Sequence, residues 1–171
     1  QNYMAFQKDL FKTHTPEHPN APAWHVFDAT FRENFMVGPL MTKAMKPDSQ
    51  IPKKWFDEGF VAKADTIREL ADMLGIDADG LEETIGKMNH YAETGKDEDF
   101  GRGDSAYDRY YADPAIKPNP CLAPIVKAPF YAMRIEAGDF GTLGGLDTDT
   151  VARVKKADGG VFEGLFAVGN C

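Results

Sequence analysis

The sequence predicts an α+β fold, because helical and strand periodicities occur in separate parts of the chain. Apolar residues recur at helical spacing between residues 64 and 95, which indicates two consecutive helices. Residues 130–135 and 161–168 alternate instead, as strands do. A chain of 171 residues is long enough for one compact domain and part of another.

Composition and charge narrow the functional classes. The chain is 43% hydrophobic and 27% charged, as expected of a soluble globular protein, and its net charge is −8. This charge opposes binding to nucleic acid, which requires clustered Lys and Arg. The chain contains no run of 18 apolar residues, so we expect no membrane span. Cys121 and Cys171 lie far apart, which favours a reduced, cytoplasmic setting.

The first third of the chain alternates between short elements and loops. Residues 2–12 have helical spacing, whereas residues 14–23 contain three prolines and predict a loop. Residues 23–28 favour a strand, and residues 31–35 favour a helical turn. The segment 37–52 is predicted to be a loop with apolar anchors at Leu40, Met41 and Met45.

The helix pair has the clearest signals at its ends. Thr66 and Glu69 have the spacing of a capping box, and Gly75 is placed to end this helix. Asp77 can cap the second helix, and Gly95 can end it. The apolar stripes of both helices are interpreted as core.

Residues 96–124 lack periodicity and predict a long loop. We expect Arg102 and Arg109 to order it by ion pairs with Asp104, Asp108 or Asp113. Tyrosines are also frequent in the chain, and a phenol can polarise a carbonyl group or carry a proton. For any single tyrosine, packing is favoured over chemistry; the candidates are Tyr3, Tyr107, Tyr110, Tyr111 and Tyr131.

The C-terminal segment is predicted to form a hairpin. Strands are expected at 151–154 and 161–168, with a turn at 158–160. Glycines flank this hairpin at 141, 144, 145 and 169, and their bare backbone can approach a ligand closely. Glycines at strand ends are more often simple turns, and no Gly-x-Gly-x-x-Gly fingerprint is present.

Other chemistry is disfavoured by spacing. The four histidines lack metal-ligand spacing, so no metal is expected. Cys121 has no activating base nearby in the sequence, which favours a buried structural thiol over a nucleophile. Ser105 lacks a Gly-x-Ser-x-Gly setting, which disfavours serine hydrolase chemistry.

Several stretches together resemble one family, the 3-ketosteroid dehydrogenase branch of the flavoproteins related to fumarate reductase and succinate dehydrogenase. The tyrosine-rich stretch Tyr107-Asp-Arg-Tyr-Tyr111 and Lys117-Pro-Asn-Pro-Cys121 are specific to this branch. Gly138-Asp-Phe-Gly-Thr-Leu-Gly-Gly-Leu146 and Gly164-Leu-Phe-Ala-Val-Gly-Asn170 are shared across the wider superfamily. The likeness covers nearly the whole chain.

The resemblance implies an inserted catalytic, or capping, domain and a short β segment of a Rossmann-like FAD domain. Residues 1–140 are then the substrate domain, and residues 141–171 are a partial return into the FAD domain. The remainder of that FAD domain is expected to be absent from this chain, which alone is therefore expected to hold FAD poorly and to be inactive. The implied partners are a steroid or another small hydrophobic ketone and the rest of the same polypeptide.

The resemblance also implies roles for particular residues. Tyr3 matches a catalytic tyrosine, and five positions lie near the flavin: Gly144, Gly145, Ala167, Gly169 and Asn170. The implied reaction removes hydrogens from the A ring of a 3-oxosteroid, with hydride transfer to flavin N5 and abstraction of a proton. Two alternatives stay open: a fumarate- or urocanate-type reductase, and a non-catalytic ligand-binding module. Fumarate reductases show a His-Thr-Met-Gly-Gly pattern where this chain has Phe140-Gly-Thr-Leu-Gly-Gly145, and the missing histidine argues against a dicarboxylate substrate.

Overall fold

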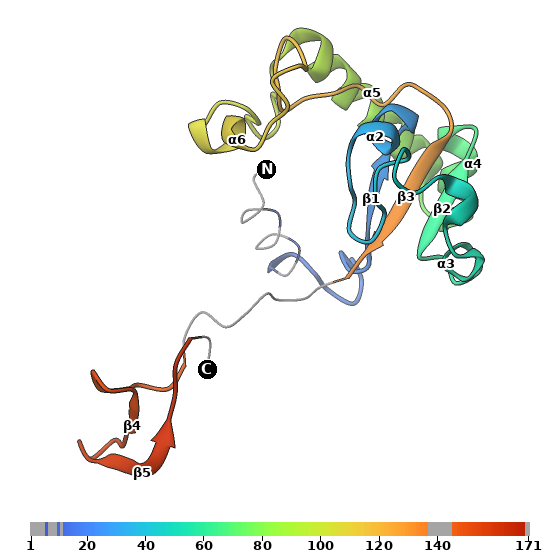
Figure 1. Ribbon diagram of the computed structural model, residues 1–171. Helices are drawn as coiled ribbons and strands as arrows, with labels where there is room; N and C mark the ends of the chain where they lie inside the picture. Colours follow the sequence, from blue (N-terminus) through green and yellow to red (C-terminus); the bar gives the residue numbers. More distant parts are fainter. Residues whose placement is uncertain (1–5, 7–9, 11, 137–144, 170–171) are drawn as a thin grey trace. The chain divides into compact units, whose positions relative to one another are not determined.

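The computed structural model describes Phe6, Leu10, residues 12–136 and residues 145–169. The chain divides into two compact units, Gln1–Glu136 (unit 1) and Ala137–Cys171 (unit 2). Figure 1 shows that unit 1 contains a sheet with helices around it, whereas unit 2 contains a hairpin. The predicted mixture of helices and strands is confirmed.

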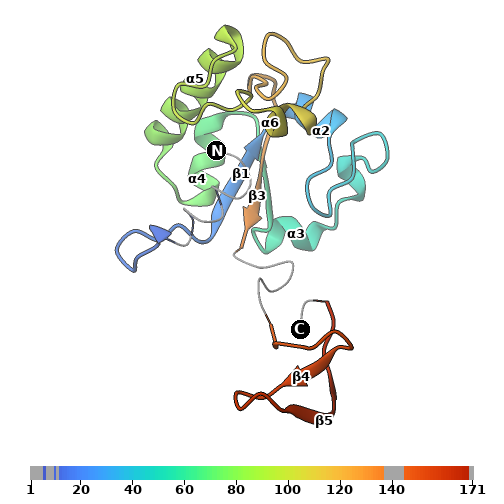
Figure 2. The same ribbon diagram turned by 90° about the vertical axis from the view of Figure 1, so that its left-hand side faces the viewer.

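Unit 1 is built on a three-stranded antiparallel sheet. The strands β1 (Ala23–Phe27) and β2 (Val61–Ala64) flank the central strand β3 (Phe130–Ile135). Figure 2 shows β1 and β3 running side by side. The predicted strands at 23–28 and 130–135 are confirmed, with Asp28 lying just beyond the first.

Each face of this sheet buries a different apolar cluster, because successive side chains of a strand point to opposite faces. On one face, Leu70 of α4 (Ile67–Leu74) packs against Ala62 and Ala132, and all three are buried. On the other face, the rings of Phe27 and Tyr131 stack with centroids 5.5 Å apart, next to buried Leu40. The sheet is therefore covered on both sides.

The helix pair is confirmed together with its predicted ends. Thr66 and Glu69 form the capping box at α4, and Gly75 ends the helix with a φ of 67°. The helix α5 (Ala78–Thr94) begins after Asp77 and ends at Gly95, whose φ is 76°. A residue with a side chain would be strained at such φ angles, so the glycines fix where both helices stop.

The helix α2 (Ala29–Asn34) begins two residues earlier than the predicted turn, and Asp28 explains why. Its carboxylate accepts hydrogen bonds from the backbone N–H of Phe31 at 2.9 Å, of Val126 at 3.1 Å and of Lys127 at 3.0 Å. One buried carboxylate thus caps the helix and ties it to a segment nearly a hundred residues later.

A buried arginine organises the loop that follows α2. Arg32 is 1% exposed and donates to the carbonyl oxygens of Met41 and Lys46, each at 2.6 Å. Its Nε lies 3.3 Å from Asp48 Oδ1, while Asp48 Oδ2 accepts from Lys63 Nζ at 2.8 Å and from the Tyr131 hydroxyl at 2.6 Å. Leu40 is buried as predicted. The prediction that Met45 is an apolar anchor is wrong, because Met45 is 65% exposed.

Several short elements went unpredicted. They are the 3-10 helix η1 (Asp48–Gln50), α3 (Lys53–Asp57), β2, and α6 (Ala106–Tyr110) within the predicted long loop. Of the predicted helix at 2–12, the described residues Phe6, Leu10 and Lys12 are helical, and the others lie outside the described residues.

The segment 96–124 is ordered by backbone contacts of two buried polar side chains. Asp97 accepts from the backbone N–H of Asp99, Phe100 and Arg102 at 3.1–3.2 Å, and from Arg102 Nε at 2.5 Å. Asn119 donates to the carbonyl oxygens of Gly95 at 3.0 Å and Arg102 at 2.9 Å. The expected pairing of Arg102 with Asp104, Asp108 or Asp113 is therefore wrong, because Asp97 takes that role. Arg109 Nε also bonds a backbone group, the Gly103 carbonyl, at 2.5 Å.

Unit 2 is a small antiparallel hairpin of β4 (Arg153–Lys155) and β5 (Val161–Phe166). The predicted turn and strand pairing are confirmed, although both strands are shorter than predicted. Val154 is buried, whereas its neighbours in β4, Arg153 and Lys155, are exposed. Most of β5 is exposed as well. Asp149 holds the start of the hairpin by accepting from Arg153 N at 2.9 Å and Arg153 Nε at 2.7 Å.

Candidate functional site

The predicted flavin-facing residues lie in unit 2. Gly145 and Gly169 are exposed, and Ala167 is half-buried with its N–H bonded to the Ala152 carbonyl at 3.0 Å. Gly169 has a φ of 72°, and no atom lies within 4 Å of the position that a Cβ would take. Tyr3, Gly144 and Asn170 lie outside the described residues, so their predicted roles stay predictions.

Unit 2 leaves backbone and apolar side chains accessible at its surface. The accessible backbone at Gly145 and Gly169 suits close contact with a cofactor, since glycine has no Cβ to obstruct it. Phe162, Leu165 and Phe166 are 45–62% exposed on the adjoining strand. So much exposed apolar surface on one short strand is typical of a surface that is covered when it functions.

Unit 1 contains two adjoining cavities along α2, which we call the α2 groove. Their volumes are about 610 and 290 Å³, within the range of small-molecule sites. The side chains that line both cavities are Phe31, Phe35, Asp113, Ile116, Ala123 and Ile125.

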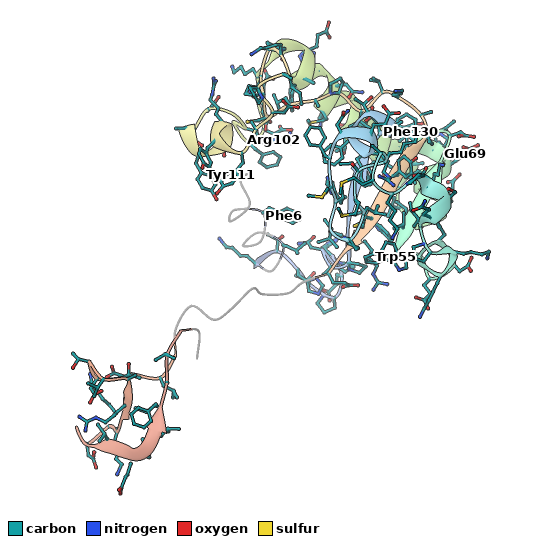
Figure 3. The ribbon with its side chains drawn as sticks, viewed as in Figure 1. Phe6, Trp55, Glu69, Arg102, Tyr111 and Phe130 are labelled. Atoms are coloured by element: carbon teal, nitrogen blue, oxygen red, sulfur yellow. The ribbon has the colours of Figure 1, made fainter. Side chains whose placement is uncertain are left out.

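The wall opposite α2 is fixed to α5. Asn89 donates to the Ile125 carbonyl at 3.1 Å and accepts from the Ile125 N–H at 2.6 Å. Arg102 and Tyr111, labelled in Figure 3, line the groove from the segment 96–124, and Tyr111 comes directly after α6. The groove thus combines side chains from distant parts of the sequence on anchored elements.

Most charged groups of the groove are already bonded within the chain. Arg102 pairs with Asp97, and its Nη2 lies 3.3 Å from Met88 Sδ. Asp108 accepts from the Gly103 N–H at 3.3 Å, and Asp113 accepts from the Ala115 N–H at 2.9 Å. These contacts leave the groove mainly apolar in character.

His25 contributes a different kind of polar group. It lies on β1, and its ring contacts Phe27 and Phe31 with centroid distances of 5.5 and 5.7 Å. Burial lowers the pKa of His25, so the imidazole is neutral at pH 7. A neutral imidazole carries one hydrogen-bond donor and one acceptor.

Cys121 lines the same cavity as His25 and is half-buried. Burial raises the pKa of its thiol, and the charge of Asp108 acts in the same direction. A raised pKa reduces the thiolate fraction, so this thiol is not activated for nucleophilic chemistry. The geometry agrees with the predicted structural role, although the thiol is less buried than expected.

The described tyrosines divide into two kinds. Tyr131 is fully buried. Burial is the main cause that raises the pKa of its hydroxyl, and the hydrogen bond to Asp48 raises this pKa further. This hydroxyl is committed to the fold and is a poor proton carrier. Tyr107, Tyr110 and Tyr111 are 58–79% exposed, and the ring of Tyr111 makes edge-to-face contacts with the rings of Tyr107 and Tyr110.

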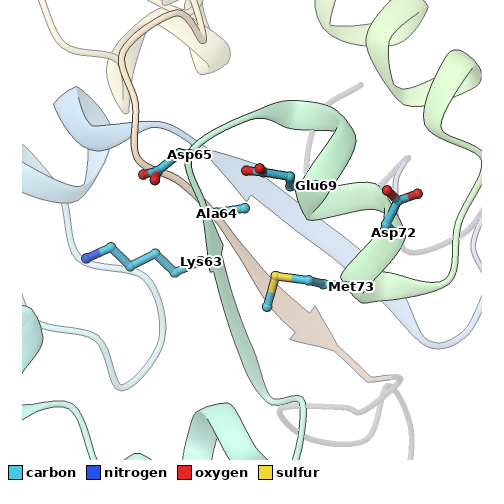
Figure 4. Close-up of a pocket in the computed structure, with 6 residues that line it drawn as sticks. All are labelled: Lys63, Ala64, Asp65, Glu69, Asp72 and Met73. Atoms are coloured by element: carbon cyan, nitrogen blue, oxygen red, sulfur yellow. The ribbon is translucent and has the colours of Figure 1, made fainter.

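A further surface depression of about 480 Å³ lies at the start of α4 (Figure 4). Two of its polar side chains serve the fold, because Glu69 completes the capping box and Lys63 pairs with Asp48. Among the described residues, no three His, Cys, Asp or Glu side chains gather as a metal site. No helix in that part of the chain is long and apolar enough to cross a membrane.

Comparison with known proteins identifies the family. A model of the FAD binding domain matches residues 1–171. The chain belongs to the FAD binding domain family. Membership of this family indicates that the cofactor is FAD.

Individual relatives are similar over most of the chain. It is 47% identical, over 88% of its length, to 3-oxosteroid 1-dehydrogenase of Mycolicibacterium smegmatis. It is 39% identical, over 99% of its length, to 4-oxocyclohexanecarboxylate 2-dehydrogenase of Sinomonas cyclohexanicum. The chain spans only 26% and 28% of these two relatives.

Solved structures have the same fold. The 3-ketosteroid delta1-dehydrogenase of Sterolibacterium denitrificans, in complex with 1,4-androstadiene-3,17-dione, matches 98% of the chain at 44% identity with a TM-score of 0.84. The chain covers 29% of that structure. A flavocytochrome c3 fumarate reductase matches at 23% identity with a TM-score of 0.60, which concerns the fold alone.

Proposed function

We propose that this chain is part of an FAD-dependent dehydrogenase that acts on the A ring of a 3-oxosteroid or on a similar cyclic ketone. The observation that carries the proposal is the 47% identity to a 3-oxosteroid 1-dehydrogenase over 88% of the chain. An alignment of 151 residues must include most of unit 1, which contains the apolar α2 groove. The Sinomonas relative, whose name also specifies an oxo-substituted ring, supports the wider class of cyclic ketones.

In this proposal, residues 1–140 form the substrate, or capping, domain, and residues 141–171 return to the FAD domain. Gly144, Gly145, Ala167, Gly169 and Asn170 line the flavin, and Tyr3 is the catalytic tyrosine. FAD, when bound, supplies the hydride acceptor. The exposed backbone of Gly145 and Gly169 supports this assignment, because it leaves room for a cofactor at unit 2.

The test uses the full-length protein that carries this chain. We expect it to purify with bound flavin and to reduce an artificial electron acceptor when 4-androstene-3,17-dione is added. The 171-residue chain alone should bind little FAD and show no turnover. Flavin-loaded protein that turns over fumarate or urocanate but no ring ketone would support a reductase instead.

The remaining alternative is a ligand-binding module without catalysis. Saturable steroid binding by a full-length protein that contains no flavin would support this module and would contradict the proposed dehydrogenase.

A further inference from the structure

The starting observation is an exposed aromatic surface around α6, which we call the tyrosine surface. It consists of Tyr107, Tyr110 and Tyr111, which are 58%, 79% and 75% exposed. The ring of Tyr111 contacts the ring of Tyr107 at a centroid distance of 5.5 Å and the ring of Tyr110 at 4.9 Å. Adjacent exposed aromatic side chains of this size are typical of a surface that another protein surface covers.

The backbone beneath the tyrosine surface is held in place by side chains. Ser105 caps α6 by accepting from the Asp108 N–H at 3.0 Å, and Arg109 Nε donates to the Gly103 carbonyl at 2.5 Å. Asn119 in turn ties the backbone beside Gly103 to the end of α5. A surface that is ordered before it binds loses less conformational entropy on binding, so this anchoring suits a specific interface.

The tyrosine surface continues into the α2 groove. Tyr111 lines the same cavity as Phe35 and Met36, and Met36 is itself 61% exposed. Phe31 of α2 packs on the opposite face of the sheet from α4, and Figure 1 shows α6 on the side of unit 1 away from α4. Unit 1 therefore presents a continuous aromatic and apolar surface on one side, as the core of an interface requires.

The length and charge of the chain indicate what covers this surface. The chain spans only 26% of a curated relative and 29% of a solved dehydrogenase, so most of such a polypeptide lies outside it. That part is tethered to unit 1 and acts at a high effective concentration. A second copy is disfavoured, because two chains that each carry a net charge of −8 repel one another.

We propose that the tyrosine surface is where unit 1 docks against the proposed FAD domain, in the part of the same polypeptide that lies outside this chain. Tyr110 and Tyr111 are the anchors, because they are the most exposed of the three and tyrosine is among the residues that dominate interface energetics. The inference rests on the proposed function for the identity of the FAD domain, and adds the residues through which that domain is held.

The first experiment is photo-cross-linking in the full-length protein, in which p-benzoylphenylalanine replaces Tyr110. Irradiation should link this position to a peptide from outside residues 1–171 of the same polypeptide, which mass spectrometry identifies. Met73 is the matched control position, because it is 62% exposed but lies on α4, and the same photoreactive residue there should form no such link. A link between two copies, equal yields at the two positions, or no link at position 110 would overturn the proposal.

The second experiment measures what the anchors contribute. Tyr110→Ser combined with Tyr111→Ser in the full-length protein should leave unit 1 folded, because both side chains are exposed within this chain. Hydrogen exchange in the peptide that cross-links to position 110 should become about tenfold faster, since truncation of interface anchors weakens docking to this extent. Met73→Ser should leave that exchange unchanged. An unchanged exchange rate in the double variant would contradict the proposed role of the tyrosines.

These outcomes separate the inference from the proposed function. A full-length protein that forms the expected cross-link at position 110 but oxidises no ring ketone would reject only the dehydrogenase. Turnover of ring ketones by a protein in which position 110 links to nothing outside residues 1–171 would reject only the inference.

Discussion

The strands of units 1 and 2 both carry large apolar side chains, but the two units bury them to different extents. In unit 1, both faces of the sheet are covered, and Leu70, Ala132 and Tyr131 are fully buried. In unit 2, Phe162, Leu165 and Phe166 lie on a two-stranded sheet and stay exposed. An isolated two-stranded hairpin is marginally stable in water. The comparison indicates that unit 1 supplies the stability of the chain, whereas unit 2 presents an apolar surface suited to the proposed FAD domain.

The largest expected effect tests the buried network of unit 1. Arg32→Met removes the charge that faces Asp48 and the bonds to the Met41 and Lys46 carbonyls. We expect a loss of about 3–5 kcal/mol in the free energy of unfolding, because the Met41 and Lys46 carbonyls lose their donor and Asp48 keeps only one of its two cationic partners, Lys63. Urea denaturation measures this loss.

The control for Arg32→Met is Lys43→Met, on the loop that Arg32 organises. Lys43 lies 3.7 Å from Glu33, and both side chains are about 40% exposed. An exposed pair is worth about 0–1 kcal/mol, so this change should be nearly neutral. Equal losses in the two variants would show that burial of Arg32 is not what stabilises the loop.

The next effect concerns the anchor of the long segment. Asp97→Asn weakens the carboxylate contacts with Arg102 and three backbone N–H groups and should cost about 1–3 kcal/mol. The pKa of Asp97 is lowered by its bonds to Arg102 and to the backbone, against the opposing effect of burial.

The sign of this pKa shift sets the pH dependence. A carboxyl group with a lowered folded-state pKa stabilises the fold above its ordinary pKa, near 4, and the stabilisation is lost as the pH falls through the folded value. The difference between wild type and Asp97→Asn should therefore shrink below about pH 4 in urea denaturation. Exposed Asp104 is the control, and Asp104→Asn should show neither effect. A difference that grows on acidification would contradict the assignment.

A smaller effect is expected at the start of α4. Thr66→Ala removes the hydroxyl that accepts from the Glu69 N–H at 3.1 Å, and should cost about 1 kcal/mol. Thr84→Ala is the matched change inside α5, where the hydroxyl bonds the Gly80 carbonyl at 2.8 Å. This second change should be neutral or slightly stabilising, because Ala is the better helix former. Thermal unfolding of the two variants compares them directly.

Local signals explain which elements could be predicted from the sequence. The ends of α4 and α5 depend on Thr66, Asp77, Gly75 and Gly95, which act within a few residues of themselves. β2 has only four residues, and its pairing depends on the distant strand β3. Periodicity cannot reveal such an element, because its partner lies about seventy residues away.

The α2 groove could not be predicted for the same reason. His25 comes from β1, whereas Tyr111 and Cys121 come from the segment 96–124, and they line one cavity next to residues 125–127, which Asp28 and Asn89 hold in place. The sequence does not indicate that Arg32 is buried, because the carbonyl groups that it bonds are brought to it by the path of the following loop. The flavin-facing glycines were proposed from family resemblance, and their spacing alone indicated only turns.

The smallest expected effect is in unit 2, and it tests the comparison most directly. Phe166 is 62% exposed, so Phe166→Ser should change the free energy of unfolding of the chain by no more than about 0.5 kcal/mol. Leu70→Ala, at a fully buried position of unit 1, should cost about 2–5 kcal/mol in the same urea titration. A loss at Phe166 as large as that at Leu70 would mean that β5 is covered within this chain. The strand β5 would then be part of a core, and its exposed side chains would no longer support the proposed contact with the FAD domain.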